Sequence, residues 1–374
     1  MTEVLQRIMA RIEREGPISF ATYMQMALYE PGCGYYVSGA HKMGWEEKDY
    51  FTSTDLSSLF ASCMGRQLQR MWVQLKQPRS FIVLEQGAGR GHLAQGVRAW
   101  AEKASPEFYA ALDYRLADIR AGQDARATAT ARSAADSNHQ DNAAPSVILS
   151  NELIDAFPVH VVEKHSDRLY EIYVDIKDRQ YERLAETLNE PPDRAFEEYL
   201  DRYRVPWRGY SDGWRAEINL DALRWMERAA NMLRRGFVLT IDYGDRARAL
   251  YSRDRREGTL LCYYNHTFND RPLTRPGEQD ITAHVNFSAL IEEGRRHGLR
   301  LSTFTTQRAW LQSMGIDEEL ERLRASDYAA SVTNRASNEG QVALLRWYSL
   351  RQGVTTLMDP AGMGNFKVLI MRRY

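Results

Sequence analysis

Three glycines at alternate positions, Gly87, Gly89 and Gly91, follow an acidic residue, Glu85. Glycine permits positive φ angles at a sharp turn and lets a ligand approach the backbone closely. The segment 92–102, directly after the last glycine, has apolar side chains on one face and reads as a helix. Because the N-terminus of a helix presents free N–H groups, this stretch predicts a turn that binds an anionic group of a small ligand.

The spacing of the glycines separates two classes of ligand. A dinucleotide-binding turn, G-x-G-x-x-G, would require a third glycine where the sequence has His92. The actual pattern, E-x-G-x-G-x-G, resembles motif I of class I S-adenosylmethionine (SAM) methyltransferases, in which the turn lies against the methionine end of SAM. The sequence therefore favours SAM as cofactor, with S-adenosylhomocysteine as product, over a dinucleotide.

A second polar group, Asn151, Glu152 and Asp155, follows a predicted strand at 147–149. In open α/β sheets, ligands bind outside the carboxyl ends of the strands. Methyl transfer from SAM mainly requires an aligned nucleophile and exclusion of water. A carboxylate at this place could align a guanidinium group by accepting two of its N–H donors. The alternative roles are structural, with Asp155 in the turn before Phe157-Pro158 and Glu152 in an ion pair.

Asp118 stands at the end of a predicted second strand, 114–117. An acid at this place in a Rossmann-type sheet can accept hydrogen bonds from ribose hydroxyls. The ribose of SAM is therefore its expected partner, and a solvated acid at a strand end is the alternative.

The elements that must position these residues follow an α/β pattern. Strands predicted at 81–84, 114–117, 147–149 and 237–242 alternate with helical segments, as in a Rossmann-like sheet. A third strand is not evident, because 121–146 is rich in Ala, Ser, Asp, Asn and Gln and has no β-branched run. No adenine-contacting residue is assigned there.

Three further local predictions can be checked directly. Residues 35–37 read as extended, and residues 184–204 read as mostly helical. Gly236 reads as the cap of a helix at 222–233.

Composition excludes several classes of function. Of the 374 residues, 44% are hydrophobic and 26% charged, and the net charge is −1, so no strong field favours nucleic acid or an anionic membrane. No apolar run is long enough to span a bilayer. The three cysteines are widely separated, and the histidines lack metal-ligand spacing, so we expect reduced thiols, no metal and a cytoplasmic protein. A homodimer is left open.

Blocks along nearly the whole chain resemble the MidA-like SAM-dependent methyltransferases, a family that includes the mitochondrial complex I assembly factor that methylates an arginine. The blocks keep the order of that family. They are Gly16-Pro17-Ile18-Ser19-Phe20, Ala27-Leu28-Tyr29, Gly34-Tyr35-Tyr36, Asp49-Tyr50-Phe51-Thr52-Ser53, residues 151–159, Asp242-Tyr243-Gly244, residues 276–285, Asp359-Pro360 and Gly362-Met363-Gly364.

The resemblance implies a class I Rossmann-like α/β fold with an N-terminal helical cap and a SAM-covering loop in 1–78. The methyltransferase domain would occupy 79–374, with inserted substrate-binding segments near 163–220 and 245–285. It also implies that Phe51 and Thr52 contact the cofactor. The sequence departs from the family at Lys48, where glycine is usual, and at Asn286, where an acid is usual.

For the acceptor, the resemblance implies an arginine in a partner protein. Tyr36 and His284 are then candidates for substrate binding, although a lone histidine is more often structural. A small-molecule acceptor and a non-enzymatic, SAM-binding assembly factor are the alternatives.

Overall fold

A computed structural model describes residues 2–38, 58–118, 144–178, 180, 183–265, 267–328 and 338–374. The predicted cofactor residues Phe51 and Thr52, Lys48 and most of the segment 121–146 lie outside these ranges.

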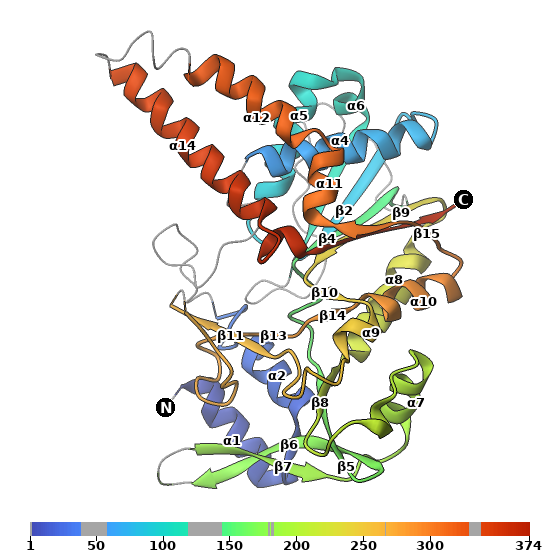
Figure 1. Ribbon diagram of the computed structural model, residues 1–374, viewed down its shortest axis with the longest axis vertical. Coiled ribbons are helices and arrows are strands. Elements are labelled where there is room, and N and C mark those ends of the chain that lie inside the picture. The colour runs from blue at the N-terminus through green and yellow to red at the C-terminus, as the bar shows by residue number, and fades with distance from the viewer. Residues whose placement is uncertain are drawn as a thin grey trace.

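A six-stranded sheet forms the centre of the upper half of the molecule (Figure 1). In spatial order its strands are β15 (Arg300–Thr306), β16 (Lys367–Arg373), β9 (Gly236–Asp242), β4 (Val147–Asn151), β2 (Phe81–Gln86) and β3 (Leu112–Ala117). The strands β3, β2, β4 and β9 are parallel, whereas β16 runs antiparallel between β9 and β15. Every residue of β9 is buried, as expected for a parallel strand covered on both faces.

Helices cover both faces of this sheet. Side chains that alternate along the strands enter two different apolar clusters, with Val147 and Leu149 in one and Ile148 in the other. The first face packs against α4 (Ser58–Gln74), α5 (His92–Ala104), α6 (Pro106–Ala111), α11 (Gln307–Ser313), α12 (Ile316–Leu323) and α14 (Asn338–Met358). The second face packs against α8 (Leu220–Met232) and α10 (Phe287–Arg296).

A second sheet lies in the lower half, beside the N-terminal helices (Figure 1). Its elements are β1 (Ile18–Ser19), β5 (His160–His165), β6 (Arg168–Asp178), β7 (Arg183–Asn189) and β8 (Arg215–Ile218), with α1 (Glu3–Glu15), α2 (Phe20–Tyr29) and α7 (Ala195–Arg202) nearby. Strand β1 pairs with β6, and apolar residues of α1, α2, β5 and β6 share one core. The first 38 residues and the insertion after β4 are therefore parts of one structural unit.

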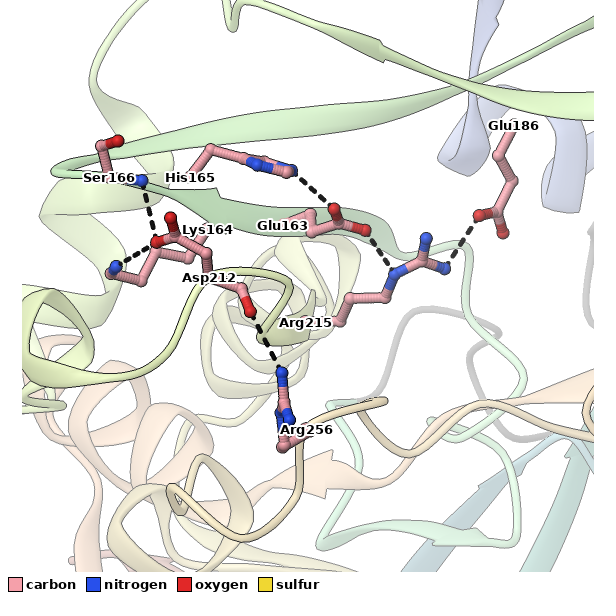
Figure 2. Close-up of polar contacts among 8 residues, drawn as sticks. All are labelled: Glu163, Lys164, His165, Ser166, Glu186, Asp212, Arg215 and Arg256. Atoms are coloured by element: carbon pink, nitrogen blue, oxygen red, sulfur yellow. Dashed lines mark hydrogen bonds and ion pairs between the residues drawn. The ribbon is translucent and has the colours of Figure 1, made fainter.

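Ion pairs and hydrogen bonds link strands of this second sheet to one another and to two residues outside them, Asp212 and Arg256 (Figure 2). The Arg215 guanidinium lies 2.7 Å from Glu163 Oε2 and 2.8 Å from Glu186 Oε2. Lys164 donates to Asp212 Oδ1 at 2.7 Å, and Arg256 donates to the Asp212 carbonyl at 3.2 Å. These contacts hold Asp212, shortly before β8, and Arg256 beside the sheet.

Two small sheets connect the halves. One contains β11 (Leu261–Tyr264), β12 (Thr267–Asn269) and β13 (Asp280–Thr282), and the other pairs β10 (Gly244–Asp245) with β14 (Val285–Asn286). A short helix, α9 (Ala247–Leu250), follows β10. None of the described helices is both long and apolar enough to cross a bilayer.

Two local predictions are wrong because backbone pairing with the preceding element overrides sequence preference. Residues 35–37 form a turn and are not extended, because the backbone folds back onto the end of α2. The two segments are so close that a Cβ at Gly34 would lie 2.5 Å from the Glu30 nitrogen. Residues 183–189 form β7 rather than a helix, because the long strand β6 offers a free edge for pairing. Only Ala195–Arg202 of the predicted helical region is helical.

Gly236 does not cap the helix before it. Leu233 ends α8, and Gly236 begins β9 with a φ of 150°. A Cβ at this position would lie 2.1 Å from the Ser146 carbonyl oxygen. The glycine is therefore required by the close approach of two backbones, not by helix termination.

Candidate active site

The glycine turn lies at the place where the strand order of the main sheet reverses. From β2 the chain crosses to β3 on one side, and later returns to β4 on the other side. Ligands of open α/β sheets bind at such a switch point, outside the carboxyl ends of the strands. Gly87, Gly89 and Gly91 have φ angles of 71°, 53° and 75°, so all three adopt the left-handed region that favours glycine.

The three glycines have different surroundings. A Cβ at Gly87 would lie 2.8 Å from the Leu153 side chain, and a Cβ at Gly91 would lie 2.8 Å from that of Leu116. A Cβ at Gly89 would meet no described atom within 4 Å. The outer glycines are thus needed for packing, whereas the middle one has no packing contact with the described residues on its Cβ side.

Two acids flank the turn. The Gly89 N–H donates a short hydrogen bond to Asp118 Oδ2. Glu85 is buried, and its Oε2 has no close hydrogen-bond partner among the described residues. Burial raises the pKa of Glu85 to about 8, the adjacent Tyr114 hydroxyl lowers it and the charge of Asp118 raises it. A cationic ligand at this turn would offset the cost of ionising Glu85.

We expect Asp118→Ala to weaken SAM binding by about 1–3 kcal/mol, because charge-assisted hydrogen bonds to the ribose and to Gly89 are lost. Isothermal titration measures the change. Asp113→Ala, on the same strand but ion-paired with Arg115, is the matched control and should leave the affinity unchanged. An unaltered dissociation constant in Asp118→Ala would assign Asp118 a purely structural role.

Asp242, at the carboxyl end of β9, organises the loop after β4. Its Oδ2 accepts backbone N–H bonds from Leu153, Ile154 and Asp155 at 2.9–3.4 Å, and its Oδ1 accepts one from Tyr243 at 3.0 Å. The side chain is fully buried. The carboxylate therefore fixes the position of the loop that carries Glu152 and Asp155.

Asp155 is buried and has one partnered and one unpartnered oxygen. Its Oδ2 accepts a 2.6 Å hydrogen bond from the Tyr243 hydroxyl, whereas Oδ1 has no hydrogen-bond partner among the described residues. Burial raises the pKa of Asp155 to about 6, whereas the Tyr243 hydroxyl and, more weakly, the backbone N–H groups of Ala156 and Asp155 oppose this shift. Asp155 therefore titrates closer to neutral pH than an ordinary aspartate.

Asn151 and Glu152 form the edge of the same loop. Asn151 Nδ2 donates to Glu152 Oε1 at 3.0 Å, and Asn151 Oδ1 is buried without a partner in the described part of the chain. Glu152 has a φ of 51°, in the left-handed region, and its N–H donates to the Ile241 carbonyl at 2.9 Å. Such a conformation is costly for a non-glycine residue, and strained residues of this kind occur often at functional sites.

Tyr36 contributes to this region from the N-terminal segment. Its hydroxyl donates to Asp280 Oδ1 at 2.7 Å, and its ring stacks on Tyr29 with centroids 5.5 Å apart. The Tyr29 hydroxyl donates to the Ala156 carbonyl at 3.0 Å. Burial raises the pKa of Tyr29, and the charges of Asp280 and Asp155 raise it further. These contacts bring α2 and β13 to the loop that follows β4.

His284 lies beside Tyr243, with ring centroids 5.4 Å apart. Burial lowers the pKa of His284 to about 4, assisted by the positive charges of Arg255 and Lys367, so the imidazole is neutral at neutral pH. Asn286 accepts the N–H groups of Ser288 and Ala289 at the start of α10 and donates to Tyr199. This residue, where relatives are expected to carry an acid, therefore serves here as a helix cap.

Sequence reasoning did not assign roles to Asp242, Tyr243, Tyr29 and Tyr263. The sequence does contain a signal for Asp242, since this acid directly ends a strand of mostly apolar residues. The bond between Tyr243 and Asp155 joins positions 88 apart in sequence, so no local pattern reveals it. Within the described ranges, no cluster of three or more His, Cys, Asp or Glu side chains could hold a metal ion.

Residues 63–305 match a family model described as "Putative S-adenosyl-L-methionine-dependent methyltransferase". The chain belongs to this family. The protein is a SAM-dependent methyltransferase, and the predicted cofactor and Rossmann-like α/β fold are confirmed.

Curated relatives and solved structures agree with this assignment. The methyltransferase is 27% identical to the rat protein named protein arginine methyltransferase NDUFAF7, mitochondrial, over 97% of this chain and 83% of the relative. Identity to the human protein of the same name is 26%, covering 99% and 84%.

Two solved structures from Burkholderia thailandensis, both of the COG1565 superfamily, have similar folds. One, bound to S-adenosyl-homocysteine, has a TM-score of 0.79 and 28% identity, covering 99% of this chain and 92% of that chain. The other, a native structure, has a TM-score of 0.73 and 26% identity, covering 99% and 91%.

The residues of the methyltransferase fit SAM. No described atom lies within 4 Å of a Cβ at Gly89, so the methionine end would be able to approach the turn there. Glu85 Oε2, which has no close hydrogen-bond partner in the described ranges, would suit a ligand that carries positive charge. Asp118 lies within reach of the same turn, as a ribose partner must. When bound, SAM supplies an activated methyl group on a sulfonium, so the protein needs only to orient the acceptor and exclude water.

Proposed function

We propose that this methyltransferase transfers the methyl group to an arginine side chain of a protein. The observation that carries the proposal is the buried Asp155 carboxylate, whose Oδ1 has no partner in the described part of the chain. A buried acceptor without a hydrogen bond is costly, so this oxygen is suited to a donor brought by the substrate. The names of the curated relatives support the same acceptor.

The charge around Asp155 favours a cationic acceptor. Burial and, to a smaller extent, the charges of Asp155, Asp280 and Glu152 raise the pKa of Tyr263 to about 12. Asp242 lies against the same loop through three backbone N–H groups. Several carboxylates in one buried region complement a guanidinium, whose planar set of N–H donors can engage two of them at once.

In the proposed reaction, Asp155 accepts the proton that the arginine guanidinium loses. Glu152 and Asp155 hold the guanidinium so that one nitrogen points to the methyl group. That nitrogen forms a bond to the methyl carbon, the bond from that carbon to sulfur breaks, and the nitrogen loses one proton. A carboxylate with a pKa of about 6 is a better acceptor for this proton than an ordinary aspartate.

Peptide substrates test the acceptor. Purified enzyme, tritiated SAM and matched peptides containing one arginine, lysine or citrulline are compared. We expect label only in the arginine peptides, with methylarginine identified by mass spectrometry. Methylation of a small molecule from a metabolite panel, with every arginine peptide and arginine-containing protein unlabelled, would overturn the proposal.

The proton-accepting role predicts a specific pH profile. Because ionised Asp155 is the active form, kcat/KM should fall as the pH decreases through about 6, by about tenfold at pH 5. Tyr243→Phe removes the hydroxyl that stabilises the ionised form, so the midpoint should move to higher pH. Initial rates from pH 4.5 to 9 measure both profiles. An identical midpoint in the variant would contradict the role of the Tyr243–Asp155 pair.

A further inference from the structure

The small sheet β12-β11-β13 places three side chains in one row. Tyr263 of β11 is directly opposite Asp280 of β13 on one side and Phe268 of β12 on the other. Directly opposed residues of antiparallel strands point to the same face. The other face carries Cys262 and Ile281, which are buried in the core shared with α1 and α2. The row therefore lies on the face that points away from this core.

This row of side chains runs from the buried Asp280, beside the acids proposed to bind the acceptor, to the surface of the protein. Asp280 is fully buried and accepts the Tyr36 hydroxyl. Tyr263 is half-buried, and the charges of Asp155, Asp280 and Glu152 act on its hydroxyl. Phe268 is 75% exposed, more than any other large hydrophobic side chain in the described ranges. A large aromatic at the outer end of such a row is a candidate contact for a macromolecule.

The spacing of the strands gives the distance across this row of side chains. Neighbouring strands are about 4.8 Å apart, so Phe268 lies about 10 Å from Asp280 across the row. An extended polypeptide advances about 3.3 Å per residue, so this distance corresponds to about three residues.

We propose that Tyr263 and Phe268 form a docking ledge for the acceptor protein, on which an apolar side chain within a few residues of the target arginine packs. The proposal rests on the arginine acceptor proposed above. The occupant follows from complementarity: the acids at the inner end suit a guanidinium, and Phe268 at the outer end suits an apolar side chain. The ledge would thus select the sequence context of the methylated arginine.

The test uses serine- and glycine-based peptides with one arginine. Leucine is placed in turn at each of the five positions before and after the arginine, and serine replaces it in the matched peptides. For the wild-type enzyme we expect about 5- to 10-fold higher kcat/KM for the best leucine peptide than for its serine partner, mainly through KM. Phe268→Ala should reduce this ratio to about one, and Phe268→Leu should largely restore it.

Leu345→Ala is the matched control, because Leu345 is 69% exposed on α14, outside the proposed ledge. It should keep the wild-type ratio, and S-adenosylhomocysteine binding verifies that each variant is folded. Equal kcat/KM for leucine and serine peptides, or an unchanged ratio in Phe268→Ala, would overturn the ledge and leave the arginine acceptor standing. If a folded, cofactor-binding enzyme methylates no arginine peptide while labelling another acceptor, the proposed function is overturned and the ledge with it.

Discussion

Gly89→Val should weaken SAM binding at least 100-fold, equivalent to about 2.7 kcal/mol, in a protein that still folds. A Cβ at Gly89 meets no described atom within 4 Å, so valine would not clash with the core. The side chain would instead occupy the space through which the cofactor approaches the turn. The φ of 53° is also unfavourable for a β-branched residue, and a shift of the backbone would disturb the N–H bond to Asp118.

Gly213→Val provides a matched control for this variant. Gly213 has a φ of 79° and equally open surroundings, but it lies beside the ion pairs of the second sheet, away from the glycine turn. It should show similar backbone strain with unaltered SAM affinity. Isothermal titration and thermal unfolding of both variants separate the two effects. Normal SAM affinity in folded Gly89→Val would mean that the cofactor does not use this turn.

Glu152→Gln should lower methyl transfer to arginine about 100-fold while SAM affinity is kept. The amide is nearly isosteric and can still accept the Asn151 Nδ2 hydrogen bond, but it cannot balance the charge of a guanidinium. A 100-fold loss in kcat/KM corresponds to about 2.7 kcal/mol of transition-state stabilisation. Single-turnover assays with tritiated SAM measure the step.

Glu163→Gln is the control for this loss of charge. Glu163 is a half-buried carboxylate in the ion-pair network of the second sheet, so its neutralisation should affect stability more than turnover. Asp155→Asn should lower both stability and turnover, because it also places an amide donor where the buried Oδ1 now lies. Full activity of Glu152→Gln would favour a neutral small-molecule acceptor. Loss of SAM binding in the same variant would instead assign Glu152 to the cofactor.

The sequence predicted those parts of the fold that depend on local patterns. The glycine turn, the strand before it and the helix after it are contiguous, and glycine is required at each turn position by positive φ. The caps by Thr2 and Ser19 also depend on contacts that are local in the chain, since each side chain accepts a backbone N–H three residues later.

Features that depend on distant contacts could not be predicted in this way. Gly236 is needed because Ser146 approaches it, although the two residues are far apart in sequence. The acceptor region is similar, since Asp155, Tyr243, Tyr36 and Asp280 come from separate segments. Alternation and capping patterns report neighbours along the chain, whereas these contacts depend on how strands are arranged in space.

The pairing of β1 with β6 has a consequence for the order in which the molecule assembles. Ile18 pairs with Val174, so roughly 150 residues separate the two strands, and at about 5–20 residues per second a ribosome needs about 8–30 s to bridge them. Until then, the apolar faces of α1 and α2 lack the strands that cover them in the finished core. The N-terminal helices would therefore be buried only long after their own synthesis. A truncation that removes them would expose the same core permanently.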